Sequence, residues 1–348
     1  MKNIDLLSKI CETPGAPGFE QRIRALVLKE IEGVADEVEI DNMGNVYAVL
    51  KGKSEKRAMV AAHMDEIGFI VTHIDDNGFI RFHTLGGFDP KTLTAQRVWV
   101  HGTKDIIGVM ASKPIHVMSP EERNKVAKIG DYFIDTGLPA EEVKKLVKVG
   151  DPITREREFI EMGECVNSKS LDNRLAVFIL IETIKNLKGK DLPFDFYGVF
   201  TVQEEVGIRG ANVASMKIQP HYGFGLDTTI AFDLPGASAH EKITELGKGA
   251  AIKIMDASTI CDYRMVNYMK EVAERNKITW QPEILTAGGT DTAGVQRMTA
   301  GGSIAGAISI PTRHLHQVIE MAHKADIQGS IDLLTACVLE LNQFNENF

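Results

Sequence analysis

Apolar runs of strand length alternate with amphipathic stretches over much of the chain. The runs typical of buried strands occupy residues 57–63, 194–202, 221–227 and 303–311. Apolar residues recur at helical spacing in residues 20–32 and 327–343, and another helical pattern opens near residue 171. Strands that alternate with amphipathic helices predict an α/β domain, with a mixed sheet and helices on both of its faces.

The pattern changes between about Ile70 and Glu164, where strands and turns follow one another. The segment 75–78, Asp-Asp-Asn-Gly, predicts a hairpin turn, and only one short helix is expected, over residues 139–148. At 348 residues the chain exceeds the usual size of one domain, about 100–200 residues. We therefore expect a small β-rich, barrel-like domain over residues 70–164, inserted into a catalytic domain made of residues 1–69 and 165–348.

Two adjacent carboxylates, Glu204 and Glu205, follow the apolar run 194–202 and precede Gly207. They should lie where a buried strand ends and the chain turns toward a helix, which is where open α/β sheets bind ligands. Two such carboxylates repel each other when they lose hydration, so a cation is expected nearby. In this interpretation Glu205 binds the cation and Glu204 stays free as a general base toward water. The alternative is a solvated acidic loop.

A histidine and an aspartate, His63 and Asp65, end the first apolar run. On a strand these two side chains point to the same face, so one can bind a metal while the other orients it. A metal-binding imidazole usually donates its second N–H to a carboxylate or a carbonyl, which suits His63 as ligand and Asp65 as its partner. The alternative is an ordinary surface histidine.

Further candidate ligands follow the other predicted strands or open a helix. Asp172 either caps the helix that begins near residue 171 or bridges two cations about 3.5–4 Å apart. Asp227 ends a buried strand, where a charge needs a partner, and either His314 or His316 could reach the same edge. Three carboxylates and two neutral imidazoles leave one positive charge beside two divalent cations, which a bridging hydroxide would neutralise. This ligand set suits Zn, Co or Mn.

Composition narrows the class of protein. The net charge of −9 argues against nucleic acid and anionic membranes as partners, because both require basic patches. The four cysteines form no C-x-x-C pair, and no apolar run approaches the ~18 residues of a membrane helix. Together with the lack of a signal-peptide pattern near the start, these features predict a soluble enzyme of the cytoplasm.

Motifs along nearly the whole chain resemble those of one known family. They are Thr13-Pro-Gly-Ala-Pro-Gly-Phe-Glu20, Asp41-Asn-Met-Gly-Asn45, Ala62-His-Met-Asp-Glu-Ile-Gly68, Val202-Gln-Glu-Glu-Val-Gly207, Ala287-Gly-Gly-Thr-Asp291 and Ile310-Pro-Thr-Arg313. Their order resembles the dinuclear metalloaminopeptidases of the tetrahedral type, which include the glutamyl and deblocking aminopeptidases.

The resemblance implies a role for each candidate residue. His63 and Asp227 would hold one divalent metal ion, and Glu205 and His316 would hold the other. Asp172 would bridge the two ions. Glu204 matches the catalytic base of the family, and Asp65 matches the residue behind the histidine ligand. Members often carry Tyr-Ile-His-Ser where this chain has His314-Leu-His-Gln317, and the position in the motif favours His316 as the ligand.

The implied function is a hydrolase that removes N-terminal residues from short peptides with a free N-terminus, using two Zn or Co ions, or Mn. The β-rich insert would join dimers that assemble into a homo-oligomeric dodecamer. The alternatives are a related di-metal carboxypeptidase or N-acyl amino acid amidase, and a non-catalytic assembly protein that keeps a metal site. Polysaccharide hydrolysis by two carboxylates is disfavoured, because that mechanism needs no histidine ligands.

Overall fold

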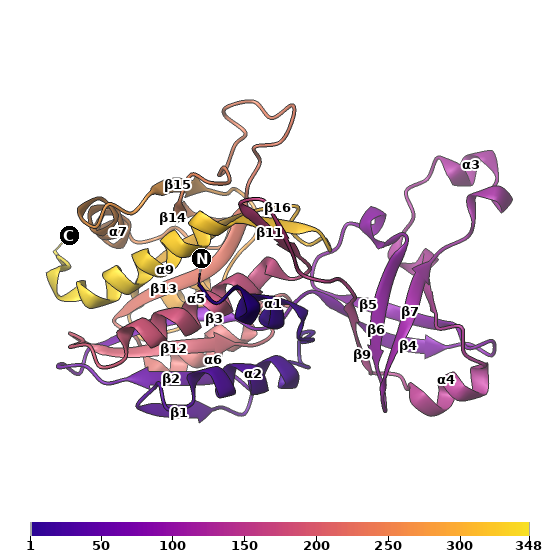
Figure 1. Cartoon of the computed structure of the whole chain (residues 1–348), viewed down its shortest axis with the longest axis horizontal. Helices are drawn as coiled ribbons and strands as arrows, with labels where there is room; N and C mark the ends of the chain where they lie inside the picture. The colour runs from indigo at the N-terminus through magenta and orange to yellow at the C-terminus, as the bar shows by residue number, and fades with distance from the viewer. Residues whose placement is uncertain (1, 348) are drawn as a thin grey trace.

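The computed structural model describes residues 2–347 and has two parts, a broad mixed sheet with packed helices and a smaller barrel (Figure 1). The barrel, at the right of the view, is built from strands between Gly68 and Arg155. This arrangement confirms the predicted fold class, an α/β domain with helices on both faces and an inserted β-rich domain.

The main sheet contains eleven strands within residues 2–347, and its central strands run parallel. Along the sheet their order is β1 (Glu37–Ile40), β2 (Val46–Leu50), β12 (Asp195–Thr201), β3 (Arg57–His63), β13 (Tyr222–Ile230), β16 (Ile304–Arg313), β17 (Glu320–His323), β11 (Cys165–Ser168) and β10 (Ile160–Met162). Two more strands branch from β16, namely β14 (Ala250–Met255) and β15 (Trp280–Ile284). β3 pairs in parallel with β12 and β13, and β13 pairs in parallel with β16, so these four strands end at the same edge.

Helices cover both faces of this sheet. Those packed into the larger core are α1 (Ile4–Glu12), α2 (Gln21–Ile31), α5 (Leu171–Leu187), α7 (Tyr263–Arg275) and α9 (Lys324–Leu339). The opposite face carries α6 (Arg209–Ile218) and α8 (Thr292–Arg297), which pack in a second core cluster. β3 shows the alternation that this layering requires, because Ala58 and Val60 lie in the first core and Met59 and Ala61 in the second. Within residues 2–347 no helix combines the length and apolarity needed to cross a membrane.

The barrel closes in the order β4 (Gly68–Ile74), β5 (Ile80–Leu85), β8 (Phe133–Asp135), β7 (Asp105–Ala111), β6 (Gln96–His101) and β9 (Pro152–Arg155). Its shorter elements are η1 (Pro90–Leu93), η2 (Ile115–Val117), α3 (Pro120–Arg123), η3 (Ile129–Asp131) and α4 (Ala140–Leu146). In the main domain, η4 (Leu341–Gln343) follows α9. β7 alternates exposed and buried residues, as a strand with one face on a core does. The hairpin expected at residues 75–78 joins β4 to β5, and Asp75 Oδ1 accepts the N–H groups of Asn77 and Phe79.

The strands of the barrel fall close to the expected insert, although the domain bounds at residues 70 and 164 stay a prediction. β4 begins slightly earlier, at Gly68, and β10 lies within the expected range but pairs with β11 of the main sheet. An ion pair joins the two parts: Arg22 of α2 donates both terminal nitrogens to the Asp105 carboxylate of β7, at 2.5 and 2.6 Å. The insert is therefore tied to the main domain near the edge where the parallel strands end.

Candidate active site

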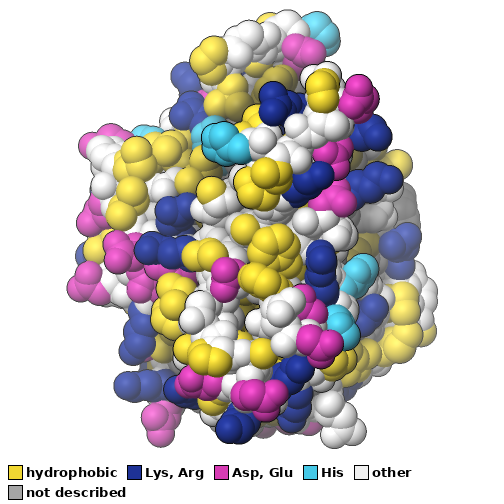
Figure 2. Space-filling view, turned by 90° about the vertical axis from the view of Figure 1, so that its right-hand side faces the viewer, with side chains coloured by type: hydrophobic (Ala, Val, Ile, Leu, Met, Phe, Trp, Pro, Cys, Tyr) yellow, Lys and Arg dark blue, Asp and Glu magenta, His cyan; other side chains and the backbone are white. Residues whose placement is uncertain are grey.

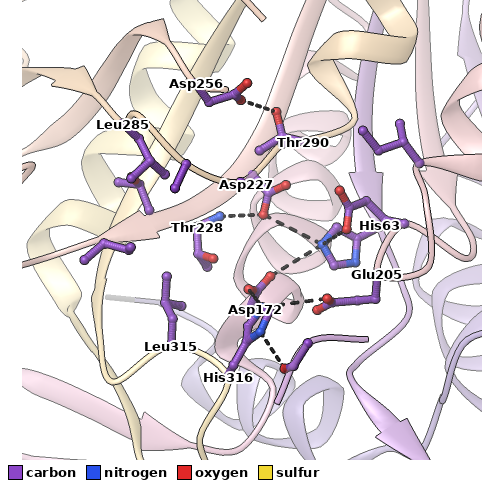
Figure 3. Close-up of a pocket in the computed structure, with 18 of the residues that line it drawn as sticks. His63, Asp172, Glu205, Asp227, Thr228, Asp256, Leu285, Thr290, Leu315 and His316 are labelled. Atoms are coloured by element: carbon purple, nitrogen blue, oxygen red, sulfur yellow. Dashed lines mark hydrogen bonds and ion pairs between the residues drawn. The ribbon is translucent and has the colours of Figure 1, made fainter. Parts of the chain in front are cut away.

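The predicted site residues meet at the edge where the parallel strands end. His63 is the last residue of β3, and Asp227 lies in the second half of β13. Glu204 and Glu205 follow the end of β12, and His316 follows β16. These side chains line one cavity of about 550 Å³, and Figure 3 shows the labelled members turned toward one another. Segments that lie far apart in the sequence thus converge through the parallel register of the sheet.

Asp172 connects two groups of potential metal ligands. The first group is His63, Asp172 and Asp227, and the second is Asp172, Glu205 and His316, with the ligand atoms of each group within 4.8 Å of one another. Asp172 Oδ1 lies 3.4 Å from His63 Nε2, and Asp172 Oδ2 lies 3.4 Å from His316 Nε2. The two oxygens of one carboxylate therefore face different groups, which is the arrangement a bridging ligand needs.

Both histidines are oriented by main-chain carbonyl groups. His63 Nδ1 lies 3.1 Å from the carbonyl oxygen of Asp65, and His316 Nδ1 lies 2.8 Å from that of Gly87. Because a carbonyl oxygen only accepts, Nδ1 donates in both cases, so Nε2, which faces the carboxylates, is the nitrogen available to a metal ion. This is the usual state of a metal-binding imidazole. Gly87 lies between β5 and η1, so the insert contributes a contact to the site.

Glu204 stands beside the first group without belonging to either. Its Oε2 lies 3.8 Å from His63 Nε2, and its side chain lines the cavity while remaining 9% exposed. Glu205 Oε2, by contrast, points to the second group and lies 3.7 Å from His316 Nε2. The two adjacent glutamates thus face different parts of the site, as expected for a base and a ligand, although these roles stay a prediction.

The electrostatics of the cluster favour cations. Burial raises the pKa of Glu205 to about 8, with the Asp172 carboxylate adding to the rise. Burial also raises the pKa of Glu204 well above its usual range. Burial opposes the charged form of His316, but hydrogen bonding to Asp172 and the Glu205 charge raise its pKa to about 10. Acidic groups therefore outnumber the cationic groups that they face.

The donor set fits divalent metal ions. Oε1 of Glu205 is buried and has no hydrogen-bond partner among the described residues, so it is an acceptor that a cation could satisfy. Imidazole and carboxylate donors together suit Zn, Co or Mn, and no thiolate takes part. The residues present therefore fit the metal centre expected from the sequence.

Asp65 differs in detail from its expected role. Its carboxylate lies 3.5 Å from His63 Nδ1, but it accepts shorter hydrogen bonds from the main-chain N–H groups of Glu204 and Glu205, at 3.0 and 3.1 Å. The residue orients His63 through its carbonyl group and supports the glutamate pair through its side chain. The sequence indicated that Asp65 orients His63 through its side chain, but β3 ends at His63 and the shorter contact to the ring comes from the Asp65 carbonyl group.

Glu320 is a buried site residue that the sequence did not indicate. Its Oε2 accepts the N–H of Asp172 at 3.0 Å, and its Oε1 accepts the N–H of His316 at 2.8 Å. Burial raises the pKa of this carboxyl to about 8, and the nearby Asp172 contributes to the rise. A carboxylate directly before the apolar pair Met321-Ala322 in β17 was the available signal.

The far wall of the cavity is aliphatic and lies over a floor of paired charges. Its aliphatic members are Ile208, Ile230, Leu285 and Leu315. Lys253 Nζ, in the floor, lies 2.9 Å from Asp256 Oδ2 and 3.4 Å from Glu283 Oε1. The loop 288–290 also lines the cavity, as the sequence motif around Asp291 indicated, whereas His314 is not among the lining residues. Lys253 thus faces two carboxylates, and the second oxygen of Glu283, Oε2, is buried without a hydrogen-bond partner among the described residues.

Comparisons with known proteins agree on one family. A family model described as M42 glutamyl aminopeptidase matches residues 44–333. A putative aminopeptidase of Acetivibrio thermocellus is 40% identical over 335 residues, which cover 96% of this chain and 98% of that protein.

Two solved structures are similar over nearly their whole length. A TET aminopeptidase from a marine sediment archaeon of the Thaumarchaeota has a TM-score of 0.95 at 35% identity and covers 99% of each chain. The TET1 peptidase of Pyrococcus horikoshii, which can assemble into a tetrahedron or a large octahedral shell, has a TM-score of 0.88. Its identity is 34%, over 97% of this chain and 99% of that one.

The contacts of Glu320 yield a prediction about cation binding. Glu320→Ala removes the acceptor from two main-chain N–H groups, those of Asp172 and His316, so both residues lose their fixed orientation. Residues behind metal ligands typically contribute 10–100-fold to affinity, and we expect cobalt to bind about 10–100-fold more weakly. Equilibrium dialysis against Co²⁺ measures the change. Glu340→Gln, which alters a carboxylate paired with Arg275 at the protein surface, is the control, and wild-type affinity in Glu320→Ala would contradict the prediction.

Proposed function

The chain belongs to the M42 glutamyl aminopeptidase family and is an aminopeptidase, and from this premise we propose that it removes N-terminal residues from short peptides at a two-metal centre. The resemblance found in the sequence is confirmed by this family match. The enzyme is a hydrolase, and divalent metal ions are the cofactors that the family and the ligand groups imply. The number and identity of the ions belong to the proposal, with two Zn or Co ions favoured and Mn as the alternative.

One observation carries the proposal, namely that Asp172 is shared by two ligand groups while Glu204 lies beside them unshared. His63 and Asp227 would hold one ion with Asp172, and Glu205 and His316 would hold the other. When bound, the two ions supply Lewis acidity toward a water molecule and toward the carbonyl of the scissile peptide bond. A site that only stabilised the fold would not require a further carboxylate such as Glu204.

Glu204 has the position of the proton carrier. Its carboxylate faces the cavity next to the first ligand group, so it can take a proton from the attacking water and pass it to the leaving amine. Asp65 would hold the main chain of Glu204 and Glu205 during this exchange, through the hydrogen bonds at 3.0 and 3.1 Å. The water would react beside the ligand groups, while the aliphatic wall would receive the side chain of the N-terminal substrate residue.

The aliphatic wall favours peptide substrates whose N-terminal residue is uncharged. A charged side chain placed against Ile230, Leu285 and Leu315 would lose hydration, and the nearby carboxylates of Asp256 and Glu283 are buried and share Lys253. Lys253 is fully buried, and Glu283 accepts the hydroxyl of Thr229 in addition to facing Lys253. We therefore propose that peptides beginning with leucine, methionine or a similar aliphatic residue are the preferred substrates.

A substrate panel tests the function and the preference separately. We expect the cobalt- or zinc-loaded enzyme to hydrolyse leucine and methionine p-nitroanilides faster than those of glutamate and lysine, because only the former fit an uncharged wall. EDTA should abolish the activity and added metal should restore it. Acetyl-leucine p-nitroanilide, which has no free amine, and carboxymethylcellulose are the controls.

The outcomes distinguish the two parts of the proposal. Cleavage of the lysine or glutamate substrate at the highest rate would contradict the aliphatic preference and leave the aminopeptidase assignment intact. Cleavage of the acetylated substrate at a comparable rate would favour the amidase alternative. Hydrolysis of the polysaccharide alone would contradict the proposed function.

Replacement of the proposed base gives a second prediction. Glu204→Gln removes the proton acceptor but no ligand, so both ions should remain bound while turnover falls by roughly 10²–10⁴-fold, the usual contribution of general acid–base catalysis. Metal analysis and kcat on leucine p-nitroanilide measure the two effects. Glu271→Gln, on the exposed side of α7, is the matched control. A Glu204→Gln variant with a near-normal rate would remove this residue from the mechanism.

The assembly belongs to the proposal as well. The tetrahedral and octahedral shells of the related Pyrococcus horikoshii peptidase suggest that this chain forms a homo-oligomer, and we propose dimers that assemble into a dodecamer. Figure 2 looks onto the barrel side and shows hydrophobic side chains among charged ones on this face. Three apolar residues of the insert, Ile115, Val117 and Val126, are 59%, 63% and 60% exposed, and we propose them as contacts to a partner chain.

Light scattering tests this assembly. The metal-loaded protein should give a mass near twelve chains, as in a related solved structure that is a dodecamer. Val117→Asp should lower the mass, because it places a charge on the exposed apolar segment that is proposed as a contact. Met216→Asp, at an exposed position of α6 in the main domain, serves as a comparison for the effect of added charge. A stable monomer in the presence of metal would contradict the assembly but not the chemistry.

A further inference from the structure

The turn that carries Glu204 and Glu205 is held by side chains from three distant segments. Its four consecutive main-chain N–H groups, those of residues 202–205, each donate to a side-chain oxygen. The N–H of Val202 donates to Asn45 Oδ1 at 3.1 Å, and that of Gln203 donates to Glu20 Oε1 at 3.1 Å. Those of the two glutamates donate to Asp65, as described above. Every amide of the turn is therefore satisfied from outside the turn.

Three carbonyl groups of the same turn, those of residues 202–204, also accept main-chain hydrogen bonds. The carbonyl oxygen of Val202 accepts the N–H of Gly210 at 3.0 Å, and that of Glu204 accepts the N–H of Ile208 at 2.8 Å. The carbonyl oxygen of Gln203 accepts the N–H of Arg209 at 3.2 Å. With partners on both sides, the main chain here has one well-defined path, which connects β12 to α6.

Gln203 itself needs this support. Its φ of 56° lies in the left-handed region, which a residue other than glycine adopts only when its surroundings impose it. The main-chain N–H of Gln203 is held by the side chain of Glu20, to which it donates a hydrogen bond. Glu20 is 2% exposed, and the same Oε1 atom also accepts the N–H of Gly18 at 2.7 Å. A buried carboxylate oxygen that accepts two main-chain N–H groups is a specific structural contact, unlike an incidental contact at the surface.

Glu20 and Asn45 come from the two N-terminal sequence motifs that the proposed chemistry leaves without a role. Glu20 ends the motif of residues 13–20, and Asn45 ends that of residues 41–45. Asn45 Nδ2 donates to Asp41 Oδ2 at 2.7 Å and to the carbonyl oxygen of Gly210 at 3.2 Å, so its amide group is fixed from both ends. Neither residue lines the cavity, so neither can contact a substrate.

We propose that Glu20, assisted by Asn45, is a positioning residue that fixes the turn so that Glu204 and Glu205 point to different parts of the site. This inference rests on the proposed roles of the two glutamates as base and ligand. Glu204 Oε2 faces His63 and Glu205 Oε2 faces His316, at 3.8 and 3.7 Å. Because the two glutamates are adjacent, any rotation of the turn at Gln203 displaces both side chains together, and a misplacement of about 1 Å can cost about 10²-fold in rate.

The test separates the reach of the Glu20 side chain from its charge. Glu20→Gln keeps an oxygen at the same reach and loses the charge, whereas Glu20→Asp keeps the charge and is one methylene shorter. Since the contact is an acceptor oxygen for two amides, we expect Glu20→Asp to lower kcat on leucine p-nitroanilide by about 10–100-fold with KM within about 3-fold. Glu20→Gln should restore kcat to within about 3-fold of the wild type, because a carboxamide oxygen accepts the same hydrogen bonds.

A second readout does not depend on catalysis. The visible absorption of the protein loaded with Co²⁺ reports the ligand geometry, and Glu20→Asp should change this spectrum through Glu205 while Glu20→Gln leaves it close to that of the wild type. Asn45→Ala should change the spectrum in the same direction. If the wild type lacks peptidase activity, the proposed function fails, but the cobalt spectra still decide the positioning role.

The matched control is Asp326→Ala, which removes a buried carboxylate that also accepts two main-chain N–H groups, those of Gly247 and Gly249, away from the cavity. We expect this variant to lose thermal stability while keeping the wild-type cobalt spectrum and KM. The proposal is overturned if Glu20→Asp keeps the wild-type kcat and spectrum, or if Glu20→Gln is as impaired as Glu20→Asp. It is equally overturned if Asp326→Ala changes the spectrum as much as Glu20→Asp does.

Discussion

The concentration of buried negative charge at the end of the parallel strands is the constraint on which the site depends. Asp172 lies within reach of both Glu205 and Asp227, and hydration that would stabilise these carboxylates in solution is largely excluded. The main-chain N–H of Thr228 donates to Asp227 Oδ1, and two histidines face the carboxylates with their Nε2 atoms. Divalent cations supply the remainder, so metal binding and the integrity of this edge are linked.

Buried charged residues that are not potential metal ligands are paired with residues of opposite charge. Lys169 lies 2.6 and 2.8 Å from the two carboxylate oxygens of Glu66, next to Asp65 in the sequence, and Lys253 is paired in the floor of the cavity. Because these charges are paired, the excess of carboxylates at this edge of the sheet lies in the two groups of potential metal ligands. The insert participates too, because the Gly87 carbonyl orients His316. The barrel is thus part of the site geometry and not only a contact surface.

Much of the fold followed from local patterns, whereas the tertiary contacts did not. The apolar run 194–202 corresponds to β12 and the hairpin signal at residues 75–78 to the β4–β5 turn, because burial and turn chemistry act over a few residues. The role of Glu320 could not be read, since its contacts depend on the pairing of β16 with β17. Likewise, His63 and Thr201 become neighbours only through the parallel register of β3 and β12. The resemblance that anticipated the ligand groups rested on the order of the sequence motifs along the chain and not on the spacing between them.

The chemistry and the substrate preference are built from different kinds of structure. His63 and Asp227 lie on strands whose positions the hydrogen-bonded sheet determines. The aliphatic wall comes instead from segments between elements, such as those that hold Ile208, Leu285 and Leu315. Loop residues can change without disturbing the pairing of the sheet. A family with one ligand arrangement can therefore hold members with different side-chain preferences, and the preference of each chain has to be argued from its own wall rather than from the family name.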